Sequence, residues 1–370
     1  MEKQVFVQQD RFKKSDYQFF VVVADIGGST AYFAVMGVRD KKRGELILKH
    51  SLPTKEITHI HSILNQLLFE AKERFDIEVN RCCIGAAGPV SRKRGYIDLT
   101  NASLHINAKE ILQNTLLNKV ILINDFEAVG YGLDMLELKK DVVTLKHIGK
   151  DLTGGWTEGN TFAVIGAGSG LGMTIVPYDF KRHLHIPLPS EGGHMDFSPQ
   201  DSFELELAQF LRTRAHQSTD IHPEFERVLS GQGMENIYDF LRSQKKQPKS
   251  APLKNVDSLK GTEKLKAIDE HYESDQTCKK TLELFLTFYA RAARTLALIS
   301  ECYSGLFITG RIAATHIALL QSGPFMHEFE LHDKKSIVLQ KIPVYIITNN
   351  DVGLYGCCNV AANFYNLGGA

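Results

Sequence analysis

Two glycine-rich loops carry the residue types that bind phosphate. The first is Asp25-Ile26-Gly27-Gly28-Ser29-Thr30 and the second is Gly166-Ala167-Gly168-Ser169-Gly170-Leu171-Gly172, and each follows an apolar run. Glycine permits positive φ and close approach of the backbone, so successive N–H groups can converge on phosphate oxygens. The carboxylate of Asp25 can bind a hydrated Mg²⁺. Either loop alone is equally typical of a tight hairpin turn. The two together, each with a hydroxyl beside its glycines, favour a phosphate ligand.

A second group of polar side chains, Asn124 and Asp125, directly follows the apolar run 120–123. An amide can donate and accept hydrogen bonds, and a carboxylate can take up a proton. At the end of a strand the same pair can instead form an Asx turn or cap the helix that residues 126–138 predict. The residues alone leave both interpretations open.

Several common site motifs do not occur in the sequence. The glycines of 166–172 fall at every second position and precede a strand-like run, so they do not form a dinucleotide-binding GxGxxG. No GxxxxGK[ST] segment occurs, which excludes a P-loop site. In HEFELH, residues 327–332, the histidines are five positions apart and would not share one helix face as a zinc-binding HExxH requires.

Strands that alternate with helices must position these loops. Apolar side chains recur at helical spacing over 60–75, and residues 202–216 and 281–303 are also predicted helices. Short apolar runs predict strands at 19–24, 31–38, 82–87, 120–123, 305–310 and 342–348. The alternation indicates an α/β protein. The polar segment 243–276, which contains Pro and Lys, is predicted as a surface insertion with a short helix near 262–272.

Length and charge restrict the class of protein. The 370 residues suffice for two domains, and 43 basic against 43 acidic residues give no net charge to attract nucleic acid or an anionic membrane. The apolar runs are shorter than the ~18 residues of a membrane helix, and the first 18 residues lack a signal-peptide core. The six cysteines lack disulfide or zinc spacing, which is typical of buried thiols in a reducing cytosol. We expect a soluble, cytoplasmic protein without nucleic-acid or membrane partners.

Eight segments occur in the order found in a known family. They are DIGGST (25–30), LTN (99–101), INDFEAVGYGL (123–133), AVIGAGSGLGMTIV (163–176), LPSEGGHMDFSP (188–199), ERVLSGQGMENIY (226–238), GLFITGRI (305–312) and IPVYIITNNDVGLYG (342–356). Together they resemble the bacterial-type glucokinases, sugar kinases of the actin-like ATPase superfamily, over nearly the whole chain. The resemblance implies a two-domain α/β fold of the ribonuclease H-like type with the ligand cleft between the domains. A small domain is expected at 1–134, completed by 353–370, and a large one at 135–352.

The resemblance also implies an activity, the ATP-dependent phosphorylation of glucose to glucose 6-phosphate. Asp125 would be the general base that removes the proton of the sugar 6-hydroxyl. The residues implied to bind glucose are Asn124, Asp125, Glu191, His194 and Glu226. Taken alone, His194 is also typical of a structural histidine and Glu226 of an exposed helix residue.

ATP and Mg²⁺ are the implied cofactors. The resemblance places the ATP phosphates at both glycine loops and at the turn of GLFITGRI, with Asp25 on Mg²⁺ through water. The implied nucleotide-binding residues are Asp25, Gly27, Gly28, Ser29, Thr30, Gly166, Gly168, Ser169, Gly170, Gly310 and Arg311.

The chain departs from the family pattern at several positions. Thr30 and Tyr32 stand where the family usually has an amide and a cation, Leu104 replaces an aromatic residue, and Arg311 replaces a second glycine. These departures leave open a sugar- or nucleotide-binding sensor with weak kinase activity, although Asp125 favours a kinase because a sensor needs no base. A kinase for another hexose, ADP or polyphosphate as donor, and a homodimer are also compatible with the sequence.

Overall fold

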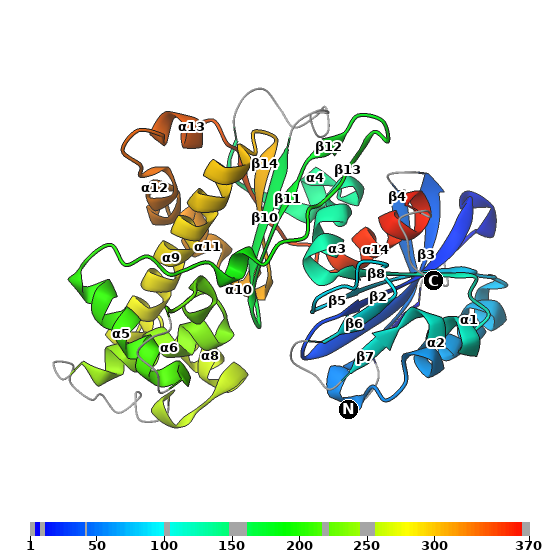
Figure 1. Ribbon diagram of the computed structural model, residues 1–370, viewed down its shortest axis with the longest axis horizontal. Helices are drawn as coiled ribbons and strands as arrows, with labels where there is room; N and C mark the ends of the chain where they lie inside the picture. Colours follow the sequence, from blue (N-terminus) through cyan, green and yellow to red (C-terminus); the bar gives the residue numbers. More distant parts are fainter. Residues whose placement is uncertain are drawn as a thin grey trace. The chain divides into compact units, whose positions relative to one another are not determined.

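The computed structural model divides the chain into two compact units (Figure 1). The first unit comprises Met1–Asp141, Val176–Pro189 and Asn349–Ala370, and the second comprises Val142–Ile175 and Ser190–Thr348. The structure describes residues 4–7, 12–40, 43–99, 104–147, 161–216, 222–244 and 256–364. Of the motif LTN only Leu99 lies within the described residues. The polar segment 243–276 is described at 243–244 and 256–276, and Val256, Ala267 and Ile268 are buried in the core of the second unit, so this part is not the surface insertion that the sequence predicts.

The first unit is built on a six-stranded mixed sheet. Its strands in spatial order are β1 (Gln4–Val7), β4 (Arg43–Pro53), β3 (Thr30–Asp40), β2 (Phe19–Ile26), β5 (Arg81–Ala86) and β8 (Lys119–Asn124). The first three pairings are antiparallel, whereas β2, β5 and β8 run parallel. The parallel register aligns Ile26 with Ala86 and Ala86 with Asn124. The carboxyl ends of these three strands therefore meet at one edge of the sheet.

Helices cover both faces of this sheet. Alternate residues of β2 enter two separate cores: Val22 and Ala24 face one, and Val21 and Val23 face the other. Helices α1 (Ile60–Phe75) and α2 (Ala108–Asn114) cover the first face, and α3 (Asp125–Gly132) and α14 (Val352–Asn363) the second (Figure 1). The helix predicted at 60–75 is confirmed.

The C-terminal helix packs unusually close to α3. A Cβ atom at Gly356 would overlap the carbonyl oxygen of Ala128, so only glycine permits this approach. The Asn359 side chain donates to the carbonyl of Tyr131 over 2.8 Å. The C-terminal segment thus completes the first unit.

Two sequence expectations differ from the structure near α3. The helix expected over 126–138 is divided into α3, the 3₁₀ turn η3 (Leu133–Met135) and α4 (Leu138–Asp141). The first unit also extends to Asp141, beyond the expected boundary at 134, resumes at Asn349 instead of 353, and includes Val176–Pro189. The reason is a contact between distant segments. Buried Asp134 accepts hydrogen bonds from the backbone N–H of His185 at 2.8 Å and from the His185 ring at 2.7 Å, and so ties Val176–Pro189 to the first unit.

The second unit has a five-stranded sheet. Its strands in spatial order are β11 (Leu171–Val176), β10 (Phe162–Ala167), β14 (Gly305–Thr309), β15 (Val344–Ile347) and β9 (Val142–Lys146). Strands β10, β14 and β15 are parallel, and β9 is antiparallel to β15. The long helix α9 (Gln276–Ser300) contacts β10, α6 (Gly231–Ser243), α8 (Gly261–Glu270) and α12 (Pro324–Glu330).

The predicted helices at 202–216, 262–272 and 281–303 correspond to α5 (Ser202–His216), α8 and α9. The shorter elements are η1 (Lys14–Asp16), η2 (Thr54–Glu56), β6 (Tyr96–Asp98), β7 (His105–Asn107), β12 (Tyr178–Asp179), β13 (Leu184–His185), η5 (Gly192–His194), η6 (Phe225–Arg227), α10 (Arg311–Thr315), α11 (Ile317–Gln321) and α13 (Ser336–Gln340). All six cysteines are buried thiols. Among the described residues, no helix combines the length and the hydropathy needed to span a membrane.

Candidate active site

Three carboxylates gather at the edge of the first sheet where the parallel strands end. Asp25 lies one residue before the end of β2, Asp125 directly follows β8, and Asp351 precedes α14. Burial and then the negative charges of Asp125 and Asp351 raise the pKa of Asp25 to about 7, while Lys49 opposes the rise. The structure therefore brings Asp25 and Asp125, two predicted site residues from distant segments, into one electrostatic cluster.

Lys49 and Gly353 support this cluster, and the sequence interpretation did not include either. Lys49 forms an ion pair with Asp351, and its ammonium lies 4.7 Å from the centre of the Tyr32 ring. A Cβ atom at Gly353 would overlap the carboxylate of Asp25. At position 32, where the family usually has a cation, the chain thus has an aromatic ring against a lysine from the neighbouring strand.

Asn124 is the N-cap of α3. Its side-chain oxygen accepts from the backbone N–H of Phe126 at 2.8 Å and of Glu127 at 3.4 Å, and its amide donates to the carbonyl of Gly88 at 3.4 Å. The capping interpretation of Asn124 is confirmed. The side-chain oxygen of Asn124 is therefore already used in hydrogen bonds within the protein. Its amide N–H makes only the long contact to Gly88, so this N–H is the group that can donate to a ligand.

An ion pair between the buried Glu127 and the half-buried Arg94 holds this cap. Glu127 accepts from the backbone N–H of Asn124 at 3.0 Å, which completes a capping box, and pairs with Arg94 at 2.8 Å. Asp125, the first residue of the helix, accepts from the N–H of Phe126 at 3.0 Å. The sequence interpretation missed Arg94 and Glu127, although an Asn followed three residues later by Glu is a capping signal.

The first glycine loop is a tight turn held by Thr54. The Thr54 hydroxyl donates to the carbonyl of Gly27 at 2.7 Å, and its N–H donates to that of Ser29 at 3.1 Å. The turn closes with a bond of 3.0 Å from the N–H of Gly27 to the carbonyl of Thr30. None of the glycines in the two loops has a positive φ. At Gly27 a Cβ atom would lie 3.3 Å from the carbonyl oxygen of Thr30, so the turn leaves little room for a side chain there.

The second loop is held by Glu226. The N–H of Leu171 donates to the Glu226 carboxylate at 2.8 Å, and a Cβ atom at Gly170 would lie 2.6 Å from it. The carbonyl of Gly168 accepts from the N–H of Gly231, the first residue of α6, at 2.8 Å. Glu226 therefore positions the loop, a role that its place in the sequence does not indicate.

Gly310 and Arg311 lie beside this second loop. Gly310 has a φ of 97°, and a Cβ atom there would be 2.5 Å from the carbonyl oxygen of Ala167. Only glycine fits this position without strain. Arg311 is the exposed first residue of α10. The structure thus brings the predicted nucleotide residues of 166–170 and 310–311 together.

The predicted sugar residues of the second unit also lie together. His194 ends η5, its Nδ1 lies 2.9 Å from the Glu224 carboxylate, and its Nε2 lies 3.8 Å from that of Glu191. Ligand atoms of His194, Glu224 and Glu226 all lie within 4.8 Å of one another. Although burial alone would lower the pKa of His194, the bond to Glu224 and the three carboxylates raise it. The sequence interpretation missed Glu224.

Comparison with known proteins gives one consistent result. The family model for glucokinase matches residues 22–364. A glucokinase of Trichormus variabilis is 31% identical over 353 residues, which cover 92% of this chain and 98% of that protein. The chain belongs to the glucokinase family. Its resemblance to that family, expected from eight sequence segments, is confirmed.

Solved glucokinase structures share the fold. The glucokinase from Balamuthia mandrillaris in complex with glucose has a TM-score of 0.74 at 20% identity, with 93% of each chain covered. A ROK family glucokinase from Streptomyces griseus in complex with glucose and AMPPNP has a TM-score of 0.61 at 17% identity, covering 92% of this chain and 99% of that one. The expected two-domain actin-like ATPase fold and the kinase class are confirmed. The roles of single residues, the homodimer and the location stay predictions.

The carboxylates of the first unit fit the Mg²⁺ that a kinase requires. Mg²⁺ is usually bound through one or two carboxylates, with several waters retained. Asp25 and Asp125 offer carboxylates for such a site. Burial is the largest cause of the raised pKa of Asp25, and the negative charges of Asp125 and Asp351, which a cation would offset, add to it. Asp25 is therefore a chemically suitable partner for hydrated Mg²⁺.

Proposed function

We propose that this member of the glucokinase family transfers the γ-phosphoryl group of ATP to the 6-hydroxyl of glucose, with Asp125 as the general base. The observation that carries the proposal is the cluster of Asp25, Asp125 and Asp351 at the carboxyl ends of parallel strands. Open α/β sheets bind ligands at that edge. The relatives are named glucokinases, and neighbouring structures contain glucose or AMPPNP.

Asp125 suits the role of base by its placement. It is the first residue of α3, directly after the N-cap Asn124, and the ion pair of Glu127 with Arg94 secures that turn. A general base works only when it lies within hydrogen-bond reach of the proton that it removes. Arg94 and Glu127 are positioning residues for Asp125, because they fix the turn that carries it.

Glucose is the proposed ligand of Asn124, Glu191, His194 and Glu226, the polar side chains that the family resemblance implies. Asn124 can donate its amide N–H to a sugar oxygen, and the carboxylates of Glu191 and Glu226 can accept from sugar hydroxyls. His194, held by Glu224, can present its Nε2 to the sugar. A neutral polyol needs acceptors for its hydroxyl protons, and this set supplies them.

The ATP phosphates are the proposed ligand of the two glycine loops. Backbone N–H groups of 27–30 and 166–170 would bind phosphate oxygens, Ser29, Thr30 and Ser169 would add hydroxyls, and Arg311 a guanidinium. Mg²⁺, held through Asp25, would neutralise charge on the transferred group. Catalysis of phosphoryl transfer then depends on positioning and electrostatics rather than on a covalent intermediate.

A coupled assay of ADP release with a panel of hexoses tests the activity, with ATP, ADP and polyphosphate as donors. We expect the highest kcat/KM for glucose with ATP. Glucose should also raise the melting temperature of the nucleotide-free protein, since a ligand of the folded state stabilises it. A thermal shift with glucose but no turnover with any donor would instead identify a sensor, and preference for another hexose would change the substrate.

A further inference from the structure

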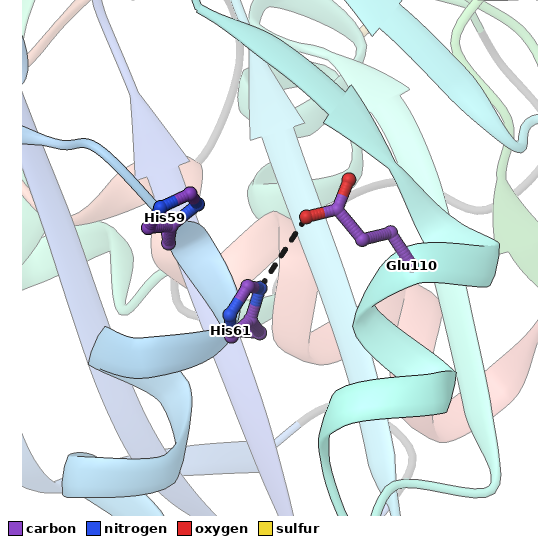
Figure 2. Close-up of side chains that lie close together, drawn as sticks. All are labelled: His59, His61 and Glu110. Atoms are coloured by element: carbon purple, nitrogen blue, oxygen red, sulfur yellow. Dashed lines mark ion pairs between the residues drawn. The ribbon is translucent and has the colours of Figure 1, made fainter.

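Two histidines and a glutamate gather on the first unit, outside the residues assigned to glucose and ATP. His59 immediately precedes α1, His61 lies in its first turn, and Glu110 lies in the first turn of α2 (Figure 2). Their potential ligand atoms all lie within 4.8 Å of one another. Figure 2 shows the Glu110 carboxylate directed at the His61 ring, with the His59 ring beside it.

We propose that His59, His61 and Glu110 form a binding site for a divalent transition metal of the Zn²⁺ class. Zn²⁺ binds imidazole nitrogen and carboxylate oxygen at ~2.0–2.2 Å in a tetrahedron, which separates neighbouring ligand atoms by roughly 3.4 Å. The His61 Nδ1 and the Glu110 Oε1 are already 3.4 Å apart. Two of the three ligands therefore have the tetrahedral spacing without any movement.

The third ligand needs only a rotation of its side chain. The His59 and His61 rings are 5.2 Å apart between centres and inclined by 29°. His59 is exposed, and its side chain makes no capping bond to α1. The imidazole can therefore turn toward a metal at little cost. With three protein ligands, the fourth position would be open to water, as in zinc sites built from two histidines and one carboxylate.

The backbone that carries these ligands is fixed. The Asn65 side chain donates to the carbonyl of Asn114 over 2.8 Å and so ties α1 to α2. Asn65 is four residues after His61, and Asn114 is four residues after Glu110, so the bond lies one helical turn from the proposed site. Leu64 and Ile111 are buried in the same core between these helices and the sheet. Fixed helices reduce the conformational entropy that metal binding would otherwise cost.

An ordinary surface ion pair is the alternative explanation of this cluster. Exposed pairs contribute about 0–1 kcal/mol and are not selected for geometry. The imidazole of His59 adds nothing to an ion pair between His61 and Glu110, and two protonated imidazoles would repel each other. An uncharged imidazole binds a metal through a ring nitrogen. The His-x-His spacing with a facing carboxylate is therefore explained better by a cation than by the pair alone.

A test of this site must distinguish it from the other groups in the protein that can bind metals. The six cysteines are buried, and burial raises the pKa of Cys82, Cys278 and Cys302, which disfavours the thiolate that binds zinc. The other group of three metal-ligating side chains with ligand atoms within 4.8 Å of one another in the described residues contains His194. The carboxylates of Asp25, Asp125 and Asp351 include no nitrogen ligand and suit Mg²⁺ rather than Zn²⁺. A protein carrying His194→Ala removes the competitor at His194 and serves as the parent for the experiment.

Titration of this chelator-treated parent with Co²⁺ and Zn²⁺ at about pH 7.5, where imidazole is mostly neutral, tests the proposal. Co²⁺ in a tetrahedral site absorbs visible light, and Zn²⁺ affinity is measured by competition with a chelating dye. We expect one equivalent of Co²⁺ to develop the band and Zn²⁺ to displace it. Adding His61→Ala or Glu110→Gln should weaken Zn²⁺ binding at least about tenfold. Loss of a residue that only orients a metal ligand already lowers affinity about tenfold or more, and these variants remove a ligand itself.

His105→Ala is the matched control, because His105 is an exposed histidine of the same unit paired with a single carboxylate, Asp98. It should leave affinity within about twofold, well below the loss expected for a ligand. His59→Ala, which truncates an exposed side chain, repeats the test if His61→Ala does not fold. Absence of the Co²⁺ band in the parent, or equal affinity in the parent, His59→Ala and Glu110→Gln proteins, would overturn the proposal.

Discussion

Asp25 is predicted to destabilise the ligand-free protein. Burial and the charges of Asp125 and Asp351 raise its pKa from 3.8 to about 7. The carboxyl therefore favours folding at low pH, and this contribution is lost as pH rises from about 4 to about 7, because the unfolded chain ionises first. The shift of about three units corresponds to ~4 kcal/mol at 1.36 kcal/mol per unit. Because the side chain is buried only in part, we discount this to about 1–2 kcal/mol for solvent screening.

Asp25→Asn keeps the size of the side chain and removes its charge. At about pH 8, above the pKa window that linkage defines, the variant should melt about 2–8 °C above the parent, as expected for 1–2 kcal/mol in a unit of this size. At about pH 5 the difference should fall to less than half, because folded Asp25 is then mostly protonated. Circular dichroism measures both transitions, and Asp16→Asn, which alters an exposed carboxylate of the same unit, is the matched control.

Two outcomes would refute this reasoning. One is a variant that is less stable than the parent at both pH values, which would make the Asp25 carboxylate a support of the fold. The other is an equal gain for Asp16→Asn. Mg²⁺ with a non-hydrolysable ATP analogue should also stabilise the parent more than Asp25→Asn, because the cation offsets a charge that the variant lacks. Loss of kinase activity should accompany the gain in stability.

Three further variants test the proposed site. Asp125→Asn cannot take up a proton at neutral pH, so kcat should fall at least about a hundredfold while the glucose-induced thermal shift persists; a kcat within about threefold of the parent, below the range for a general base, would contradict the assignment. Glu127→Gln loses the charge that pairs with Arg94 and should lower the free energy of unfolding by ~1–3 kcal/mol, measured by urea titration, and an unchanged midpoint would show that the pair is dispensable. Arg311→Gly should raise the KM for ATP and leave that for glucose unchanged, and an unchanged or lower KM for ATP would show that the guanidinium points to solvent.

Local patterns predicted the elements and the strand ends of this chain. Apolar runs located the central strands because buried parallel strands are continuously hydrophobic. The helical spacing over 60–75 matched the buried side of α1, including Leu64 and Leu67. Asp125 was found because it directly follows such a run, and sheet register then placed it near Asp25. These features depend on residues that are close in sequence.

Features that depend on distant segments were missed. Lys49 reaches Asp351 across 302 positions, and His194 reaches Glu224 across 30. No periodicity links such residues, since their meeting depends on how strands and loops are arranged in three dimensions. The same holds for Val176–Pro189, whose hydrogen bonds to Asp134 place it in the first unit. Glu127 differs, because its capping signal was present in the local sequence.

Glu226 links the two ligand functions proposed for the second unit. Its carboxylate accepts from the N–H of Leu171 at 2.8 Å and so holds the second glycine loop. Gly193, beside the predicted sugar residue His194, packs so closely on the carbonyl of Leu171 that a Cβ atom would overlap it. The segments that carry the residues proposed to bind sugar and the residues proposed to bind phosphate in this unit therefore both contact Leu171 or its neighbours. A sugar hydroxyl that binds Glu226 would change the charge available to the loop N–H. Sugar binding and phosphate binding within this unit are thus expected to be thermodynamically coupled, because Glu226 would contact the sugar and also holds the loop whose N–H groups would bind phosphate.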